Sequence, residues 1–143
     1  LDRTVGGNPD KEILRSNRRT LYATISRTGD RFESDAFLRL FDFPAAVSTS
    51  ASRPTSTVPQ QYLFMMNSPF MTERAKTLGN SLHAQKEPLP DRIKKVYRQL
   101  YSRSPDPAEI KLGTQWLGDK STPKAWQQYA QVLLSAHELI QIQ

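Results

Sequence analysis

The chain has 143 residues, of which 37% are apolar and 24% charged, and it contains no cysteine. This length fits one domain of common size, and the missing thiols exclude disulfide frameworks, thiolate-held zinc and a cysteine nucleophile. No window approaches the ~18 consecutive apolar residues of a membrane-spanning helix, so we expect no membrane span.

The net charge of +6 is concentrated in residues 92–124, which carry eight basic and three acidic side chains. Lys94, Lys95 and Arg98 fall on the polar face of a predicted helix, while the tyrosines of that segment fall on its apolar face. We therefore expect a solvated basic face. Binding of a polyanion or nucleic acid through this face is kept as a second alternative, and nucleic acid is not the partner we expect.

The composition along the chain predicts its organisation. Residues 1–19 read as a polar, irregular lead-in from a longer parent chain, and residues 20–143 as a single α-helical domain. Within that domain, half of the residues in 44–57 are Ser or Thr, which predicts a loop.

One short strand is predicted near residues 20–26. Leu21, Ala23 and Ile25 alternate with polar or aromatic residues, and this period of two is typical of a strand. A single strand needs a partner for its backbone groups. That partner would be an extended piece near Val47 or Val58, or chain outside this sequence.

The rest of the chain predicts a mainly α fold, an irregular bundle of five to six short helices with antiparallel neighbours. Apolar periodicity and proline punctuation place the helices at 33–41, 59–66, 69–82, 91–103, 107–117 and 123–140. In the helix over 107–117 the predicted buried stripe is Ala108, Leu112 and Trp116.

Helix ends carry clear signals in this sequence. Ser68, Asp91, Asp106 and Thr122 are predicted N-caps, and all but Asp91 are followed by a proline at the first helical position. Glu109 completes a capping box with Asp106, and Gly118 is a predicted stop. The acids Asp30, Glu33 and Asp35 cluster at the start of the first predicted helix, where its dipole favours negative charge.

The residue pattern indicates no catalytic, metal or cofactor site. A metal site needs about three convergent ligands, and His83 and His137 are both predicted to be core or boundary histidines bonded to backbone. Asp42 lies between two phenylalanines that would raise its pKa, and we interpret it as a turn residue. Because no nucleophile elbow or phosphate loop is present either, we do not expect an enzyme.

Methionines cluster around the break between the second and third predicted helices. Met65, Met66 and Met71, with Phe64 and Phe70, are predicted to pack in the core. A methionine-lined groove for a partner helix is the alternative.

Several blocks together resemble a known group of proteins. They are Arg18-Arg19-Thr20-Leu21-Tyr22, Leu40-Phe41-Asp42-Phe43-Pro44, Thr57-Val58-Pro59-Gln60-Gln61, Phe64-Met65-Met66-Asn67-Ser68-Pro69-Phe70, the Arg92 to Pro105 segment with Glu109, and Leu133-Leu134-Ser135 with Glu138-Leu139. The set resembles the C-terminal region of large planctomycete proteins that carry a cytochrome-c-like domain followed by domains of unknown function. The resemblance implies an exported, multidomain parent and an extracytoplasmic location. Haem is not implied for this chain, because it contains no Cys-x-x-Cys-His motif.

From these observations we expect a non-catalytic structural or protein-interaction module of an exported multidomain protein. The expected partner is another domain of the parent chain or a separate protein. A carbohydrate- or polymer-binding or hydrolase-associated domain is the first alternative. The candidate interaction residues are Arg19, Asp42, Arg53, Gln60, Asn67 and Ser68, which flank the apolar joints where the Ser/Thr-rich loop has to dock.

Overall fold

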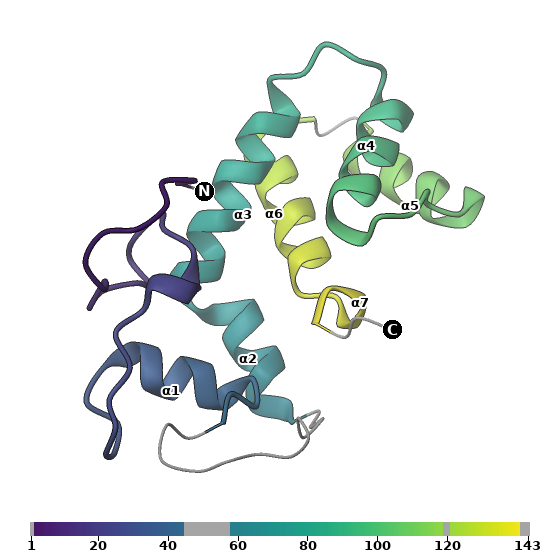
Figure 1. Cartoon of the computed structure of the whole chain (residues 1–143). Helices are drawn as coiled ribbons and strands as arrows, with labels where there is room; N and C mark the ends of the chain where they lie inside the picture. Colours follow the sequence, from purple (N-terminus) through teal and green to yellow (C-terminus); the bar gives the residue numbers. More distant parts are fainter. Residues whose placement is uncertain (1, 45–57, 119–120, 141–143) are drawn as a thin grey trace. The chain divides into compact units, whose positions relative to one another are not determined.

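The computed structural model describes residues 2–44, 58–118 and 121–140, which form two compact units, Leu1–Gln61 and Tyr62–Gln143 (Figure 1). The helices are η1 (Thr20–Tyr22), α1 (Glu33–Leu40), α2 (Pro59–Asn67), α3 (Pro69–His83), α4 (Leu89–Tyr101), α5 (Pro107–Leu117), α6 (Pro123–Leu134) and α7 (His137–Ile140). The mainly α fold is thus confirmed, and the described residues contain no strand. The predicted division into 1–19 and 20–143 stays a prediction, since a compact unit need not be an independent domain.

The predicted strand near residues 20–26 is wrong. Thr20–Tyr22 form a turn of 3-10 helix, and the only extended pairing described there is an isolated bridge between Asp10 and Ala23. The amide of Asp10 donates to the Tyr22 carbonyl at 2.8 Å and that of Thr24 to the Asp10 carbonyl at 2.9 Å. A single bridging residue is not enough to start a β-ladder. The backbone before Ala23 therefore forms local hydrogen bonds instead. Of the expected partners, Val47 lies outside the described residues.

The lead-in, residues 2–19, is irregular, but hydrogen bonds connect its parts to one another and to Tyr22. The Arg18 guanidinium donates to the carbonyls of Gly6 and Asn8, the latter at 2.9 Å, and its carbon lies 4.2 Å from the centroid of the Tyr22 ring. The Tyr22 hydroxyl accepts from the Gly6 amide at 3.1 Å. Ile13 is only 1% exposed, so this polar segment contributes a buried apolar side chain to its unit.

The apolar core of the second unit lies between α3, α4, α5 and α6. Its buried members are Leu82, Ile93, Val96, Tyr97, Leu117, Ala125, Trp126, Tyr129 and Leu133. α3 and α6 run side by side and antiparallel (Figure 1), with Gln127 bonded to Asn80 at 2.9 Å and, beyond the start of α3, Gln131 bonded to the Met66 carbonyl at 2.6 Å. The apolar residues that recur at helical spacing in the predicted helices at 69–82 and 91–103 are buried or half-buried, as expected. They are Met71, Ala75, Leu78 and Leu82, and Ile93, Val96, Tyr97, Leu100 and Tyr101.

Local capping signals fix the starts of α3, α5 and α6. Ser68 accepts from the Met71 amide and Thr122 from the Ala125 amide, both at 3.2 Å, and the Asp106 capping box forms with Glu109. The N-cap predicted at Asp91 is wrong, because α4 begins at Leu89 with Pro90 in its first turn. Asp91 instead pairs with Lys94 at 3.0 Å.

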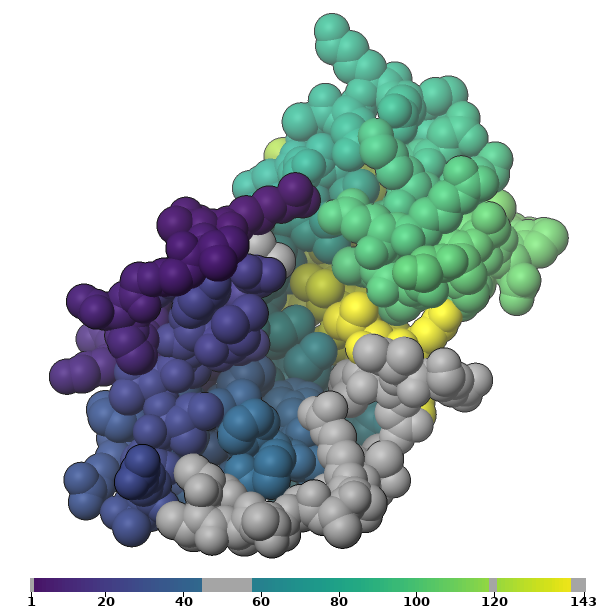
Figure 2. Space-filling view, in the orientation of Figure 1, coloured from purple at the N-terminus to yellow at the C-terminus, as the bar shows by residue number. Residues whose placement is uncertain are grey.

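The last predicted helix is divided in two. α6 ends at Leu134 and α7 begins at His137, with the amides of Ser135 and Ala136 closing the end of α6. The break carries α7 against α4, where the yellow C-terminal segment borders the green one in Figure 2. The Tyr101 hydroxyl donates to the Leu133 carbonyl at 2.7 Å, just before the break.

The stripe predicted to bury α5 is also wrong. Ala108, Leu112 and Trp116 are exposed, with Leu112 at 72%, whereas Gly113 and Leu117 are buried. A Cβ on Gly113 would lie 2.6 Å from the Tyr129 hydroxyl. α5 therefore approaches its neighbours through its smallest residue, and this close approach selects the buried face.

Candidate functional site

A pocket of about 320 Å³ opens in the first unit between the loop that precedes α1 and the C-terminal end of α1. Its lining comes entirely from residues 25–44. The residues are Ile25, Ser26, Arg27, Thr28, Gly29, Asp30, Asp35, Leu38, Arg39, Phe43 and Pro44. A volume of this size lies at the lower end of the range for small-molecule sites.

Asp35 organises the loop wall of the pocket. Asp35 is 6% exposed as a residue. Its carboxylate accepts from the amide and hydroxyl of Ser26 at 3.0 and 2.8 Å and from the amides of Arg31 and Phe32 at 3.1 Å each. Donation from the Ser26 amide, supported by the other donors, holds the pKa of Asp35 below its usual value. The loop is thus wrapped around a charged carboxylate and held in one conformation.

Two further features fix the same loop. The hydroxyl of the fully buried Ser34 donates to the Thr24 carbonyl at 2.6 Å, which anchors the start of the loop. Gly29 has φ +65° with no atom near the place of a Cβ, so glycine is favoured there by its backbone conformation alone. The Ser26 hydroxyl also contacts the Gly29 carbonyl across this turn.

The pocket combines an apolar wall with charged groups. Phe43 and Ile25 are 40% and 44% exposed, and Leu38 and Pro44 complete the apolar side. Arg39 forms an ion pair with Asp30. Arg27 also lines the pocket and has no acidic partner among the described residues.

This arrangement suits binding better than proton transfer. General acid–base catalysis needs a carboxyl group whose pKa is raised toward the working pH. The pKa of Asp35 is shifted in the opposite direction, and Asp30 is engaged by Arg39. Asp35 is therefore held as a charged structural group, and Asp30 is occupied by its ion pair with Arg39.

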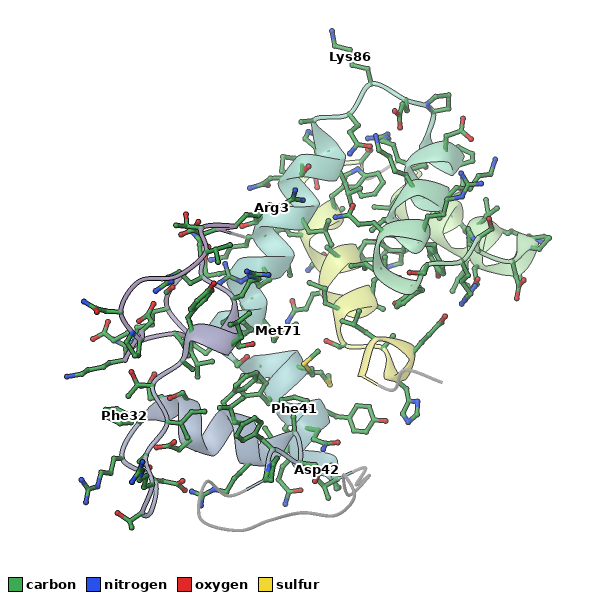
Figure 3. The ribbon with its side chains drawn as sticks, viewed as in Figure 1. Arg3, Phe32, Phe41, Asp42, Met71 and Lys86 are labelled. Carbon is green, nitrogen blue, oxygen red and sulfur yellow. The ribbon has the colours of Figure 1, made fainter. Side chains whose placement is uncertain are left out.

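Asp42 lies at the C-terminal end of α1 beside Phe41, as the labels in Figure 3 show. It is half-buried with φ +60°, and its amide donates to the Arg39 carbonyl at 3.1 Å. It occupies the turn position expected from the sequence. It is not among the residues that line the pocket.

The other candidate interaction residues occupy separate positions. Arg19 precedes η1 with its guanidinium carbon 5.8 Å from the Tyr22 ring centroid, and Gln60 is exposed in the first turn of α2. Asn67 is the exposed last residue of α2, and Ser68 next to it caps α3. Arg53 lies outside the described residues. Their part in an interaction stays a prediction.

Sequence reasoning missed the pocket itself. It identified Asp30, Glu33 and Asp35 as acids at the start of a helix, but assigned them to the helix dipole. The contact between Ser26 and Asp35 spans nine residues and follows no motif. Only the serine and glycine content of the preceding loop offered a signal.

In the second unit, Arg103 joins two carboxylates from different helices. Its guanidinium donates to Glu109 with two bonds of 2.8 Å and to Glu138 with bonds of 2.6 and 2.8 Å. The hydrogen bonds from Arg103 lower the pKa of Glu109 and of Glu138. This cluster links the end of α4, the start of α5 and α7, so its role is structural.

The basic face of α4 is partly neutralised. Lys94 pairs with Asp91 at 3.0 Å and Lys95 with Glu87 at 3.2 Å. Lys86, labelled in Figure 3, is exposed in the connection before this helix. Paired lysines are less available to phosphate, which favours the solvated face expected from the sequence.

Among the described residues, neither histidine forms the hydrogen bond to backbone that the sequence predicts. His137 is exposed on α7, with its ring 6.1 Å from that of Tyr62. His83 is half-buried, and its Nδ1 atom has no hydrogen-bond partner within the described part of the chain. In that same part, no group of three His, Cys, Asp or Glu side chains is placed to hold a metal ion.

The methionine cluster is divided between core and surface. Met65 and Met71 are 8% and 7% exposed, as predicted for core residues, whereas Met66 is 53% exposed. The rings of Phe64 and Phe70 lie 6.4 Å apart beside them. The cluster therefore serves packing at two of its three methionines.

A comparison with protein-family models identifies the family of this chain. The model of the PSD1 family, proteins of unknown function (DUF1553), matches residues 4–117. The chain belongs to this family. Neither the curated proteins nor the solved structures give a match. The matched region of this PSD1 member contains the whole pocket and ends at the last residue of α5. No helix in its described residues combines the length and apolarity needed to cross a bilayer.

Proposed function

We propose that this chain is a non-catalytic binding module of an exported, multidomain planctomycete protein, working outside the cytoplasm. Its parent would also carry a cytochrome-c-like domain, and its protein partner would be another domain of that parent. The sequence blocks that resemble such proteins support this placement. Family membership by itself assigns no activity.

The proposed binding role rests on one observation, which is that the loop wall of the pocket is ordered before any ligand binds. Four hydrogen bonds to Asp35 hold the loop over residues 26–32, while Arg27, Thr28 and Asp30 on the same loop line the pocket. A wall ordered before binding lowers the conformational entropy lost when a ligand enters. Side chains on a loop held by a rigid support are typical of binding sites.

The absence of catalysis is the second half of the proposal. The two acids that line the pocket are engaged by donors, and the pKa of Asp35 is lowered. A hydrolase would need one carboxyl group that stays protonated near neutral pH. The pocket therefore supports recognition of a ligand without its conversion.

The experiment is a titration of the ¹⁵N-labelled chain with three small probes, sodium glucuronate, glucose and sodium benzoate, followed by amide chemical shifts. We expect at least one probe to shift amides of residues 25–44, with those of α4 unmoved. The same samples are kept at 25 °C for days, and the probe spectra should stay unchanged. Absence of shifts at 25–44 with all three probes, or conversion of a probe, would overturn the proposed function.

A further inference from the structure

We infer that the pocket of the first unit is a binding site for a uronic acid, a sugar ring of hexose size that carries a carboxylate. The inference rests on the proposed function and names the chemical class of the ligand. Three properties of the lining point to three parts of such a molecule: a cationic group, a paired donor and acceptor, and an apolar wall.

The carboxylate is matched by Arg27. This residue lines the pocket from the ordered loop, and no acid among the described residues pairs with it. A guanidinium presents parallel N–H donors that fit a carboxylate with two bonds. Asp35 remains charged nearby, but the four donors that it accepts from already balance much of its charge.

The hydroxyls are matched by the ion pair between Asp30 and Arg39. Their side chains are 46% and 47% exposed, so both still present polar atoms to the pocket. A sugar hydroxyl both donates and accepts, and neighbouring hydroxyls can therefore bond to both partners of the pair. A carboxylate on an apolar ring without hydroxyls would cover these charged groups and displace their water. It would not replace the lost hydrogen bonds, and this loss costs free energy.

The ring itself is matched by the apolar wall and by the volume. Phe43, Ile25, Leu38 and Pro44 offer C–H and aromatic surface, against which the C–H face of a pyranose packs. About 320 Å³ is large enough to accommodate one such ring. The ligand would be a single uronic acid or the end residue of an acidic polysaccharide.

The three probes of the titration separate these contributions. Glucose has the ring and hydroxyls without the carboxylate, and benzoate has the carboxylate and an apolar ring without the hydroxyls. We expect glucuronate to bind about tenfold more tightly than either, since each missing partner leaves a charged or polar group unsatisfied. Its affinity should fall as salt rises, because the contact is ionic.

Substitutions locate the effect. Arg27→Gln should weaken glucuronate about tenfold and leave glucose unchanged, and Phe43→Ala should weaken both sugars. Arg98→Gln removes the same charge from an exposed position on α4 and should change neither by more than about twofold. The amide spectrum of each variant verifies its fold.

Two results would overturn the uronic acid assignment while leaving the proposed function intact. One is benzoate or glucose binding at residues 25–44 as tightly as glucuronate. The other is equal weakening by Arg27→Gln and Arg98→Gln, which would mean general attraction to a basic chain. A failure of all three probes at residues 25–44 would instead remove the proposed function itself.

Discussion

Gly79 of α3 lies directly against the backbone of Gln127 of α6. A Cβ built on Gly79 would be 2.5 Å from both the Cα and the amide nitrogen of Gln127 and 2.7 Å from the carbonyl carbon of Trp126. These are backbone atoms, which cannot rotate away as a side chain does. The separation of the two helices is therefore set by the absence of a side chain at this one position.

Gly79→Ala is accordingly expected to destabilise the protein. Overpacking of a core contact costs about 1–3 kcal/mol, and the upper part of that range applies because rigid backbone is displaced. Helix propensity works in the other direction, since alanine gains about 1 kcal/mol over glycine within a helix. Urea unfolding measures the net effect. Ser81→Ala, at an exposed position of the same helix, is the control and should be nearly neutral.

The two apolar stripes of α5 should respond very differently to truncation. Leu117 is fully buried, so Leu117→Ala should cost about 2–5 kcal/mol of unfolding free energy. Leu112 is 72% exposed, so Leu112→Ala should change it by less than about 0.5 kcal/mol. Thermal and urea unfolding of the pair measure the difference. Equal losses would contradict the assignment of the buried face.

Ser68 is expected to contribute to stability through its cap. Its hydroxyl accepts from the Met71 amide, and Ser68→Ala should lower the unfolding free energy by about 1 kcal/mol. Ser68→Asp keeps an acceptor at the same position and should restore most of that stability. If both variants lost stability equally, the hydroxyl would be acting through something other than the helix end.

The contribution of the Arg103 cluster to the free energy of unfolding should be lost in acid. Because the pKa values of Glu109 and Glu138 are lowered in the folded state, their contribution is complete above the unfolded pKa of about 4.3. It is lost as the pH falls through the lowered folded values. Both side chains are partly exposed, so solvent screening limits the contribution to about 1 kcal/mol or less.

A comparison of melting temperatures between pH 7 and pH 2 tests this point. Glu138→Gln should melt below the wild type at pH 7, and the two curves should converge at the acid end. Glu73→Gln removes an exposed acid that pairs with Lys76 within one helix turn and serves as the control. A constant gap between wild type and Glu138→Gln at every pH would show that charge on Glu138 is not the cause.

Asp35 should control the order of the loop before α1. In Asp35→Ala the amides of Ser26, Arg31 and Phe32 lose their common acceptor, so their hydrogen exchange should become faster. Amides of α4 should keep their exchange rates. Asp30→Ala removes a neighbouring acid that holds no such set of amides, and it should leave these three rates close to the wild-type values.

We expect Asp35→Ala to affect ligand binding as well as loop order. If the ordered loop is what prepares the pocket, the variant should bind glucuronate more weakly even though Arg27 and Phe43 are unchanged. The titration already described measures this. Unchanged affinity with a disordered loop would mean that the loop does not shape the site.

The amino-acid sequence determined the features of this protein that depend on neighbouring residues. Ser68, Asp106 and Thr122 cap their helices and prolines follow them, because a cap satisfies amides only two or three positions away. The buried stripes of α3, α4 and α6 follow from helical periodicity in the same way.

The tertiary structure alone decided which of two apolar stripes α5 buries, because that choice depends on how Gly113 fits against Tyr129, a residue on another helix. It also replaced the predicted strand with a single bridge, since a strand forms only where a partner extends beside it. The pocket belongs to this second group. Ser26 and Asp35 meet only when the chain turns back on itself, and residues nine positions apart have no local geometry that fixes such a contact.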